Sequence, residues 1–337
     1  MAGNPNFDEF LSTTLKNYRA QMADNITNHA IFWKWMRDKK RFRTEAGGTS
    51  IVEPLLYGEN TTIKSYSRYE TLDITPQAGI TAAEFAWKQI AGSVSIDGFS
   101  EFINQPSKTR VIGLLETKML QLEISFRERL NFMIINGDGS GNGGKDLPGL
   151  AIVLEDGQVW STFGGIDRSQ APNAFWRNRW VEWGFTTMSE ANFGTGGSAA
   201  GIKKMRRLVN KTTRGSDRIT LLLTDLTTYE TYENALAINE RFVMPVKAAL
   251  DGGFESLAFR SIPLMWDEDV PASHMYGINF DYLSFVTGKG RDFITLPFVR
   301  PPDQEAKVSS VIYYGSLTAN NNQRSGVITP TNAGGGE

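Results

Sequence analysis

The chain of 337 residues contains no cysteine, and its 35 Lys and Arg residues nearly balance its 37 Asp and Glu residues. The lack of cysteine excludes disulfides, thiolate metal sites and a cysteine nucleophile. The charge balance is unlike the strong positive excess of proteins that bind nucleic acid through many phosphate contacts, so any contact with DNA should be local.

The N-terminus carries no targeting signal that we can identify. Residues Met1 to Asp8 lack a basic region followed by an apolar one, and no later stretch approaches the roughly 20 apolar residues that cross a bilayer. We therefore expect a protein that is made and kept in a cytoplasm, with no membrane partner.

The segment from Asn6 to Met36 has the periodicity of an amphipathic helix with loops. From Lys34 to Arg43 the charged residues are basic except for Asp38, and large apolar side chains stand between them. Two interpretations stay open: an arm that contacts another subunit, or a solvated helix face over a local core. The candidate contact residues of this arm are Trp33, Trp35, Lys39, Lys40 and Arg41.

A β pattern follows, with strand-like runs at 49–56, 63–74 and 83–96. If two arms pair between Tyr57 and Gly92, each has about 18 residues and a length of about 55–60 Å, at about 3.3 Å per residue. A two-stranded ribbon of this length does not fit inside a compact domain and is marginal alone in water, so we expect it to rest on another subunit. The candidate contact residues of the ribbon are Tyr66, Arg68, Tyr69 and Glu70.

Residues 107–136 give the strongest helical signal, because apolar residues recur at steps of three and four. Ser107 suits the N-cap, and Gly137 stands where a helix ends. A continuous helix here would be about 45 Å long at about 1.5 Å per residue, several times the common length. The sequence therefore predicts a spine helix.

The glycine-rich run at 137–144 matches two motifs in part. Its GxGxxG pattern follows a helix, whereas a dinucleotide-binding turn follows a strand. Its similarity to an EF-hand loop fails at Gly149, where a bidentate glutamate is required. We therefore predict a surface loop.

The rest of the chain mixes helix and strand patterns. Helices are expected at 197–212, which is basic, and at 226–238. Strands are expected at 218–224, 257–266, 275–285, 293–298 and 307–314, and a loose tail at 332–337.

No constellation of catalytic residues emerges. His29 and His274 are the only histidines, and neither HxxH, HExxH, GxSxG nor a Walker loop is present. The acidic run Asp267, Glu268 and Asp269 lies between two expected strands and is best explained as a solvated turn. We predict no catalytic, cofactor or metal site.

The order of arm, ribbon, spine helix, glycine loop and mixed α/β region resembles the major capsid proteins of tailed phages, whose fold is named after the Hong Kong 97 phage. Short motifs across nearly the whole chain also resemble that family. They are residues 47–51 with 53–55, Ala86-Trp87-Lys88-Gln89, Leu147-Pro148-Gly149-Leu150, residues 164–168 with 176–178, and Tyr314-Gly315-Ser316-Leu317.

The resemblance implies an α+β fold with five parts. They are an N-terminal arm at 1–50, an extended loop or β-ribbon at 51–92, a peripheral domain at 93–147 and 288–319 with the spine helix at 107–136, a mixed α/β axial domain at 148–287, and a C-terminal segment and tail at 320–337.

The implied function is that of a non-enzymatic shell protein. Many copies would assemble through pentamers and hexamers, in the host bacterial cytoplasm, into the icosahedral capsid of a tailed phage around its double-stranded DNA genome. Further partners would be a portal, a decoration protein and, without specificity, the packaged DNA. Because the arm begins near Met1, we expect a separate scaffolding protein or earlier cleavage of a leading segment. Two alternatives stay open: the shell of an encapsulin-like nanocompartment, and a soluble α/β enzyme with an unrecognised site.

Overall fold

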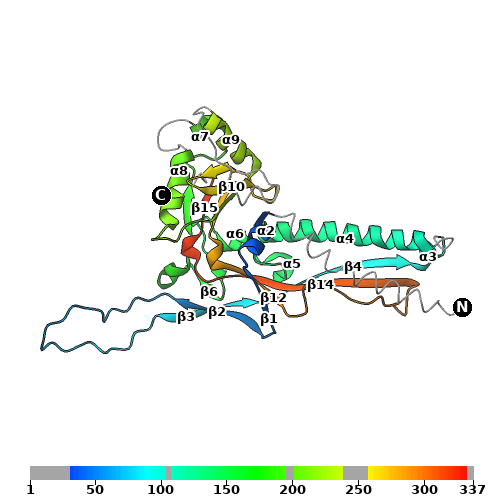
Figure 1. Ribbon diagram of the computed structural model, residues 1–337, viewed down its shortest axis with the longest axis horizontal. Coiled ribbons are helices and arrows are strands. Elements are labelled where there is room, and N and C mark those ends of the chain that lie inside the picture. The colour runs from blue at the N-terminus through cyan, green and yellow to red at the C-terminus, as the bar shows by residue number, and fades with distance from the viewer. Residues whose placement is uncertain (1–30, 104–107, 195–200, 238–256, 332–337) are drawn as a thin grey trace.

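The computed structural model describes residues 31–103, 108–194, 201–237 and 257–331. Figure 1 shows a long arm in which α4 (Lys108–Asn136) runs beside β4 (Lys88–Asp97) and β14 (Ala306–Ala319). A second part, called the axial part after the axial domain expected at 148–287, stands over one end of this long arm. A loop projects from the same end and points away from the long arm. The subunit is therefore far from spherical.

The long arm is built on a five-stranded sheet in the order β1-β12-β14-β13, with β4 also paired to β14. One edge of β14 pairs antiparallel with β4 over ten residues, and the other edge pairs with β12 and β13. β14 is thus the central strand that ties the whole sheet together. The remaining strands of this sheet are β1 (Phe42–Glu45), β12 (Leu283–Gly288) and β13 (Ile294–Thr295).

The spine helix α4 confirms the sequence prediction, although Ser107 lies outside the described residues. Phe126, Leu130 and Met133 are buried along its apolar face, and Leu122 packs against the same core. The helix lies so close to β4 that a Cβ at Gly92 would be 2.5 Å from a ring carbon of Phe126. Glycine at this position therefore allows the helix and the sheet to approach each other.

The predicted glycine loop is also present. Its short turn α5 (Gly141–Gly144) contains three residues with positive φ, Asn142 at 51°, Gly143 at 67° and Gly144 at 81°. Asp138 accepts hydrogen bonds from the Ser140 backbone N–H at 2.9 Å and from its hydroxyl at 2.6 Å. The Asp138 carboxylate, which stands at the first position of the EF-hand-like pattern, is therefore already hydrogen-bonded within a local turn.

The axial part contains a six-stranded sheet in the order β7-β15-β11-β8-β10-β9. Helices α7, α8 and α9 share a core with one face of this sheet, and side chains from its other face join the core of the long arm. The strands are β7 (Arg179–Glu182), β8 (Leu221–Thr224), β9 (Leu257–Phe259), β10 (Ile262–Trp266), β11 (Met275–Ile278) and β15 (Gly326–Thr329). The helices are α7 (Glu190–Gly194), α8 (Gly201–Thr212) and α9 (Leu226–Ala237).

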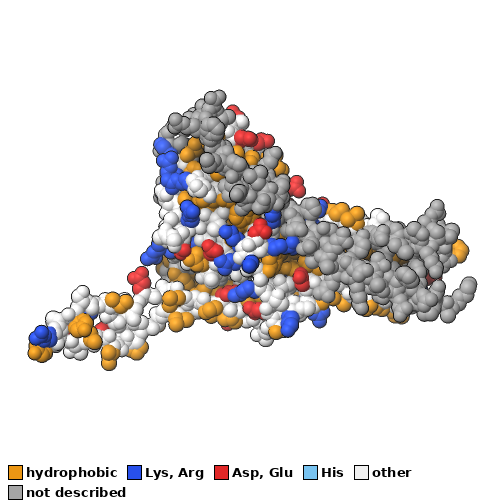
Figure 2. Space-filling model, in the orientation of Figure 1, with side chains coloured by type: hydrophobic (Ala, Val, Ile, Leu, Met, Phe, Trp, Pro, Cys, Tyr) orange, Lys and Arg blue, Asp and Glu red, His pale blue; other side chains and the backbone are white. Residues whose placement is uncertain are grey.

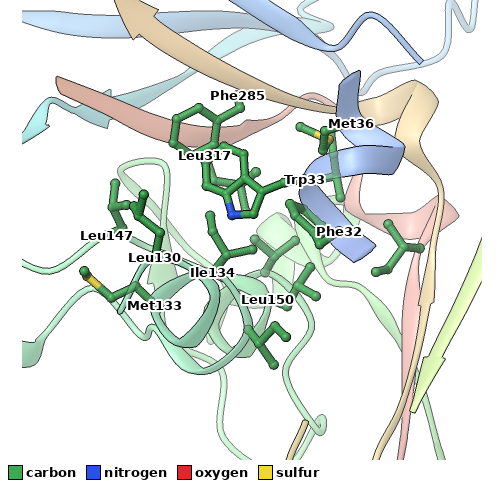
Figure 3. Close-up of a cluster of buried hydrophobic side chains, with 14 of the residues drawn as sticks. Phe32, Trp33, Met36, Leu130, Met133, Ile134, Leu147, Leu150, Phe285 and Leu317 are labelled. Carbon is green, nitrogen blue, oxygen red and sulfur yellow. The ribbon is translucent and has the colours of Figure 1, made fainter. Parts of the chain in front are cut away.

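The parts meet in one hydrophobic core (Figure 3). Helix α2 (Ile31–Asp38) inserts Trp33, whose ring lies 4.7 Å from that of Phe285 and 5.5 Å from that of Phe42. Leu130 of the spine and Leu150 of α6 (Leu150–Val153) complete this core, and both are fully buried. Smaller elements connect the parts: α3 (Gly98–Ile103), β5 (Thr162–Phe163), β6 (Ile166–Asp167) and the 3-10 turns η1 (Ala171–Trp176), η2 (Phe280–Tyr282) and η3 (Asn322–Arg324).

Several expected strand runs differ in the structure. The run at 257–266 is a hairpin of β9 and β10, and the run at 275–285 divides into β11 and β12, which belong to different sheets. The run at 63–74 forms no strand, and the run at 83–96 divides at Trp87 into β3 (Ile80–Ala86) and β4, which pair with different partners. The boundary expected at residue 287 falls inside β12, because that strand belongs to the sheet of the long arm. The C-terminal segment contributes β15, a buried strand between β7 and β11. The tail expected at 332–337 lies outside the described residues.

Candidate subunit-contact surface

The extended loop begins on a short hairpin. β2 (Ser50–Leu56) and β3 pair antiparallel from Ser50 opposite Ala86 to Leu56 opposite Ile80. Alternate side chains of this hairpin are buried, among them Ile51 and Phe85, and the Phe85 ring makes an edge contact with Phe163 at 5.1 Å. Because alternate side chains of a strand point to the same face, one face of the hairpin packs against the body of the subunit.

A buried carboxylate anchors this hairpin further. Glu53 forms an ion pair with Arg43 of β1 and accepts a hydrogen bond from the Thr318 hydroxyl of β14 at 3.0 Å. Because a buried charge without a partner is costly, these contacts lock the start of the loop to the sheet of the long arm.

The hydrogen-bonded ladder between β2 and β3 ends where Gly58 and Gly79 come together. The backbone N–H groups of Tyr57 and Gly58 both donate to the Gly79 carbonyl, at 2.9 and 3.3 Å. A Cβ at Gly58 would lie only 2.7 Å from the Cα of Gly79, so the chains touch here. The ribbon predicted between Tyr57 and Gly92 is therefore wrong in its pairing. Strand pairing has already ended before Tyr57 on the outgoing strand, and on the returning strand it is absent before about Gly79.

Beyond the two glycines, residues 59–78 project from the body without strand pairing (Figure 1). Local contacts hold the tip: Lys64 pairs with Glu70 at 3.2 Å, and the Asp73 carboxylate accepts hydrogen bonds from Thr75. These hydrogen bonds lower the pKa of Asp73. The loop is thus shaped by its own turns and not by a β ladder.

The loop exposes large apolar side chains. The exposed fraction is 83% for Ile63, 94% for Tyr69 and 90% for Ile74. Large apolar groups concentrated on one projection are characteristic of an interaction surface. The predicted contact residues Tyr66, Arg68, Tyr69 and Glu70 all lie on this exposed tip. Sequence reasoning missed Ile63 and Ile74 as contact candidates, because their apolar character was assigned to a strand.

The predicted contact residues of the N-terminal arm fall into a buried group and an exposed group. Trp33 and Trp35 are buried in the subunit's own core, so the expectation that they anchor a neighbouring subunit was wrong. The physical reason is that their partners Phe42, Phe280 and Phe285 come from the same chain.

The cations of the arm lie at the surface. Lys39 and Lys40 are exposed, with the Lys39 Nζ 6.0 Å from the centre of the Trp35 ring. Arg41 forms an ion pair with Asp281 at 2.5 Å, so its charge already has a partner within the subunit. Lys39 and Lys40 remain the contact candidates of this segment.

A second exposed apolar surface lies at the far end of the long arm. Phe99 and Phe102 of α3 are 71% and 69% exposed. The two phenylalanines stand three residues apart on a short helix, which is the spacing of one helix face. That spacing was the signal in the sequence for this surface, which the sequence interpretation left unused.

The acidic run lies against the spine helix. The Asn131 amide donates to Asp267 at 3.0 Å and to Asp269 at 2.6 Å, and the Asn136 amide donates to the Asp269 carbonyl at 2.6 Å. Burial raises the pKa of Asp267; hydrogen bonds from the Asp269 backbone N–H and the Asn131 amide oppose this shift, and the charges of Asp269 and Glu268 add to it. The run is therefore a joint between the axial sheet and the spine, and not the fully solvated turn that was expected.

Within the described ranges, no three His, Cys, Asp or Glu residues lie close enough together to hold a metal ion. The ring of His274 contacts the Ala272 carbonyl at 2.9 Å, and His29 lies outside these ranges. No helix in the part of the chain that the structure describes is both long and apolar enough to cross a membrane.

Comparisons by sequence find neither a matching protein-family model nor a matching curated protein. Comparison of the structure gives clear matches. A cyanophage A-1(L) capsid protein aligns with 86% of this chain and 90% of its own at a TM-score of 0.60 and 14% identity. The capsid of a Myoviridae phage, XM1, aligns over 87% and 90% of the two chains at a TM-score of 0.55 and 9% identity.

The chain has the Hong Kong 97 capsid fold. The encapsulin of the SrpI complex from Synechococcus elongatus shares this capsid fold, with a TM-score of 0.54, 12% identity and 88% and 86% of the two chains aligned. At these identities the likeness concerns the fold. Phage capsids and an encapsulin shell both use the capsid fold that this chain adopts, and the expected α+β class is confirmed.

Proposed function

We propose that this chain is the major capsid protein of a tailed phage. Many copies close through pentamers and hexamers into an icosahedral shell around a double-stranded DNA genome, and the chain performs no catalysis. The observation that carries the proposal is the projecting loop at 59–78, which exposes apolar side chains that no part of its own subunit covers in the described structure. The capsid fold supports the same conclusion.

The loop suits a contact between copies for a physical reason. Burying exposed apolar surface contributes about 25 cal/mol per Å², and stable obligate interfaces bury about 2,000 Å² or more. A projection that carries Ile63, Tyr69 and Ile74 and is rigidly anchored by the hairpin at its base can supply such contacts to a neighbour. Phe99 and Phe102, at the far end of the long arm, offer a second exposed apolar surface.

The proposal includes partners and a location. The shell resides in the virion after assembly in the host cytoplasm, with a portal at one vertex and a separate scaffolding protein during assembly. A decoration protein and the packaged DNA are further partners. The domain division into arm, extended loop, peripheral part and axial part follows the expected ranges, with β12 assigned to the peripheral sheet and β15 to the axial sheet.

An encapsulin-like nanocompartment is the second candidate, because the SrpI encapsulin shares the capsid fold at a similar TM-score. Negative-stain imaging of purified assemblies tests whether the chain forms shells, and treatment with nuclease tests whether the shells protect DNA. Closed shells with protected genome-length DNA are expected. Shells that hold protein cargo and no DNA would favour the nanocompartment, and a soluble monomer with no assembled particles would contradict both.

A further inference from the structure

Basic and acidic residues are separated along the chain in residues 201–237 and 262–288. Between Gly201 and Arg218 every Asp, Glu, Lys or Arg except Asp217 is basic. In the segments 219–237 and 262–288 every such residue is acidic. Because the whole chain is almost neutral and the charges of residues 148–200 are mixed, this division belongs to the named segments and does not follow from the overall composition.

Helix α8 presents four of its five basic side chains on one face, whereas Lys204 is buried on the inward side. Its inward side buries Met205 and Leu208, and the opposite side is exposed. Four cations and one amide line a shallow hollow on that exposed face: Lys203, Arg206, Arg207, Asn210 and Lys211. Arg260, from the turn after β9, adds a further cation and donates to the Asn210 side chain at 2.8 Å. Figure 2 shows these basic side chains along the edge of the axial part, over α8.

Helix α9 and the turn after β10 present the acidic charges. Glu230 and Glu233 are exposed on α9, and Glu268 is exposed in the turn. Trp266, at the end of β10, is 36% exposed beside that turn. An exposed tryptophan next to carboxylates suits an arginine-rich partner, because guanidinium groups stack on aromatic faces and pair with carboxylates.

The two helices that carry these charges lie toward opposite edges of the axial sheet, and Arg260 alone joins the basic face from the side of β9 and β10. α8 packs on β7 and β15 at one edge, whereas α9 packs on β10 near the other. Figure 1 shows the two helices on different sides of the axial part. A closed ring of identical subunits is made by head-to-tail contacts in which one surface meets a different one on the next copy.

We infer that the basic face of α8 in one copy docks on the acidic surface formed by α9 and the turn after β10 in the next copy around a ring. The inference rests on the proposed function, since it requires rings of copies. Individual exposed ion pairs contribute little, but complementary patches select the partner and its orientation, and patches of like charge repel. The occurrence of both patches in one chain favours a second copy over a nucleic acid, which would need only the basic face.

Two charge-reversed variants test this contact. Lys203→Glu, Arg206→Glu and Arg207→Glu make both surfaces acidic, and Glu230→Lys, Glu233→Lys and Glu268→Lys make both basic. Each variant alone should be folded by circular dichroism but should give less than about a tenth of the parent yield of shells. A chain with all six changes exchanges the two signs and should recover assembly, which separates a lost contact from a lost fold.

Mixing the two variants gives the sharpest readout. Alternating copies satisfy every contact in a hexamer, whereas a pentamer must contain one contact between like charges. The equimolar mixture should therefore form hexamers, or tubes and sheets built of hexamers, without closed shells. Sedimentation of the mixed variants at low salt should show an association that neither variant shows alone, and that added salt weakens.

Several results would overturn the inference. If the variant with the reversed α8 face forms parent-like shells, the contact is wrong, and loss of packaged DNA from those shells would assign the basic face to nucleic acid. If the mixed variants do not associate in solution, the inference fails whether or not the parent forms shells. If the parent forms no shells although the variants associate, the proposed function fails and the contact between copies stands.

Discussion

The spine helix and the extended loop both reach far from the centre of the subunit, but only the helix is covered by its own chain. Along α4, Phe126 and Leu130 are buried against β4 and the central core. In the loop, Tyr69 and Ile74 are almost fully exposed. The shape of the spine is thus fixed within one subunit, whereas the apolar surface of the loop is left exposed by its own subunit, as the proposed contact with a neighbour requires.

The largest effect is expected from Leu130→Asp. This position is fully buried in the core where the spine meets α2, so an unpaired carboxylate there should cost several kcal/mol, comparable to the stability of a domain. We expect insoluble or unfolded protein by circular dichroism. Ser125→Asp, at an exposed position of the same helix, is the control and should remain folded. A folded Leu130→Asp variant would show that the core is assigned wrongly.

An intermediate effect is expected at the base of the loop. Arg43→Met leaves the buried Glu53 carboxylate with only the Thr318 hydroxyl as partner, and the free energy of unfolding should fall by about 1–3 kcal/mol. Denaturant unfolding measures the change. Adding Glu53→Gln should restore part of the loss, because it removes the unpaired charge. Equal stability of parent and Arg43→Met would mean that the hairpin is anchored by its apolar face alone.

A smaller, pH-dependent effect is expected at the joint between the spine and the axial sheet. The raised pKa of Asp267 means that the folded state holds the proton more tightly than the unfolded state. The stabilisation by that proton is complete below the unfolded pKa of about 3.9 and is lost as pH rises through the folded pKa. Asp267→Asn should therefore raise the melting temperature at pH 7 but not at pH 3. A lowered melting temperature at pH 7 would show that the charged form is the stabilising one.

The smallest effect on stability is expected at the tip of the loop. Tyr69→Ser with Ile74→Ser should change the free energy of unfolding by no more than about 0.5 kcal/mol, because both side chains are exposed. Particle yield should nevertheless drop, whereas the control Thr71→Ser on the same loop should leave it unchanged. A large loss of stability would indicate that the tip packs on its own subunit.

The sequence predicted the elements whose signal is local. The period of apolar residues set the spine, and glycine and asparagine with positive φ set the loop after it. The resemblance to capsid proteins correctly indicated the fold.

Features that depend on distant parts of the chain could not be predicted in the same way. The burial of Trp33 requires Phe285, which comes from the other end of the sequence. β15 is short and lacks alternation, and only its partners β7 and β11 make it a strand. The β pattern at 63–74 was misleading, because exposed Tyr and Thr residues have strand propensity even where the ladder has ended.

The most direct test of the account replaces residues 59–78 with Asn-Gly. The strand ends already touch at Gly58 and Gly79, so a two-residue turn can close the hairpin without moving its base. Circular dichroism and thermal melting should match the parent, whereas electron microscopy should show single subunits or small rings in place of closed shells. Closed shells at the parent yield and heat resistance would contradict the claim that the loop joins neighbouring subunits.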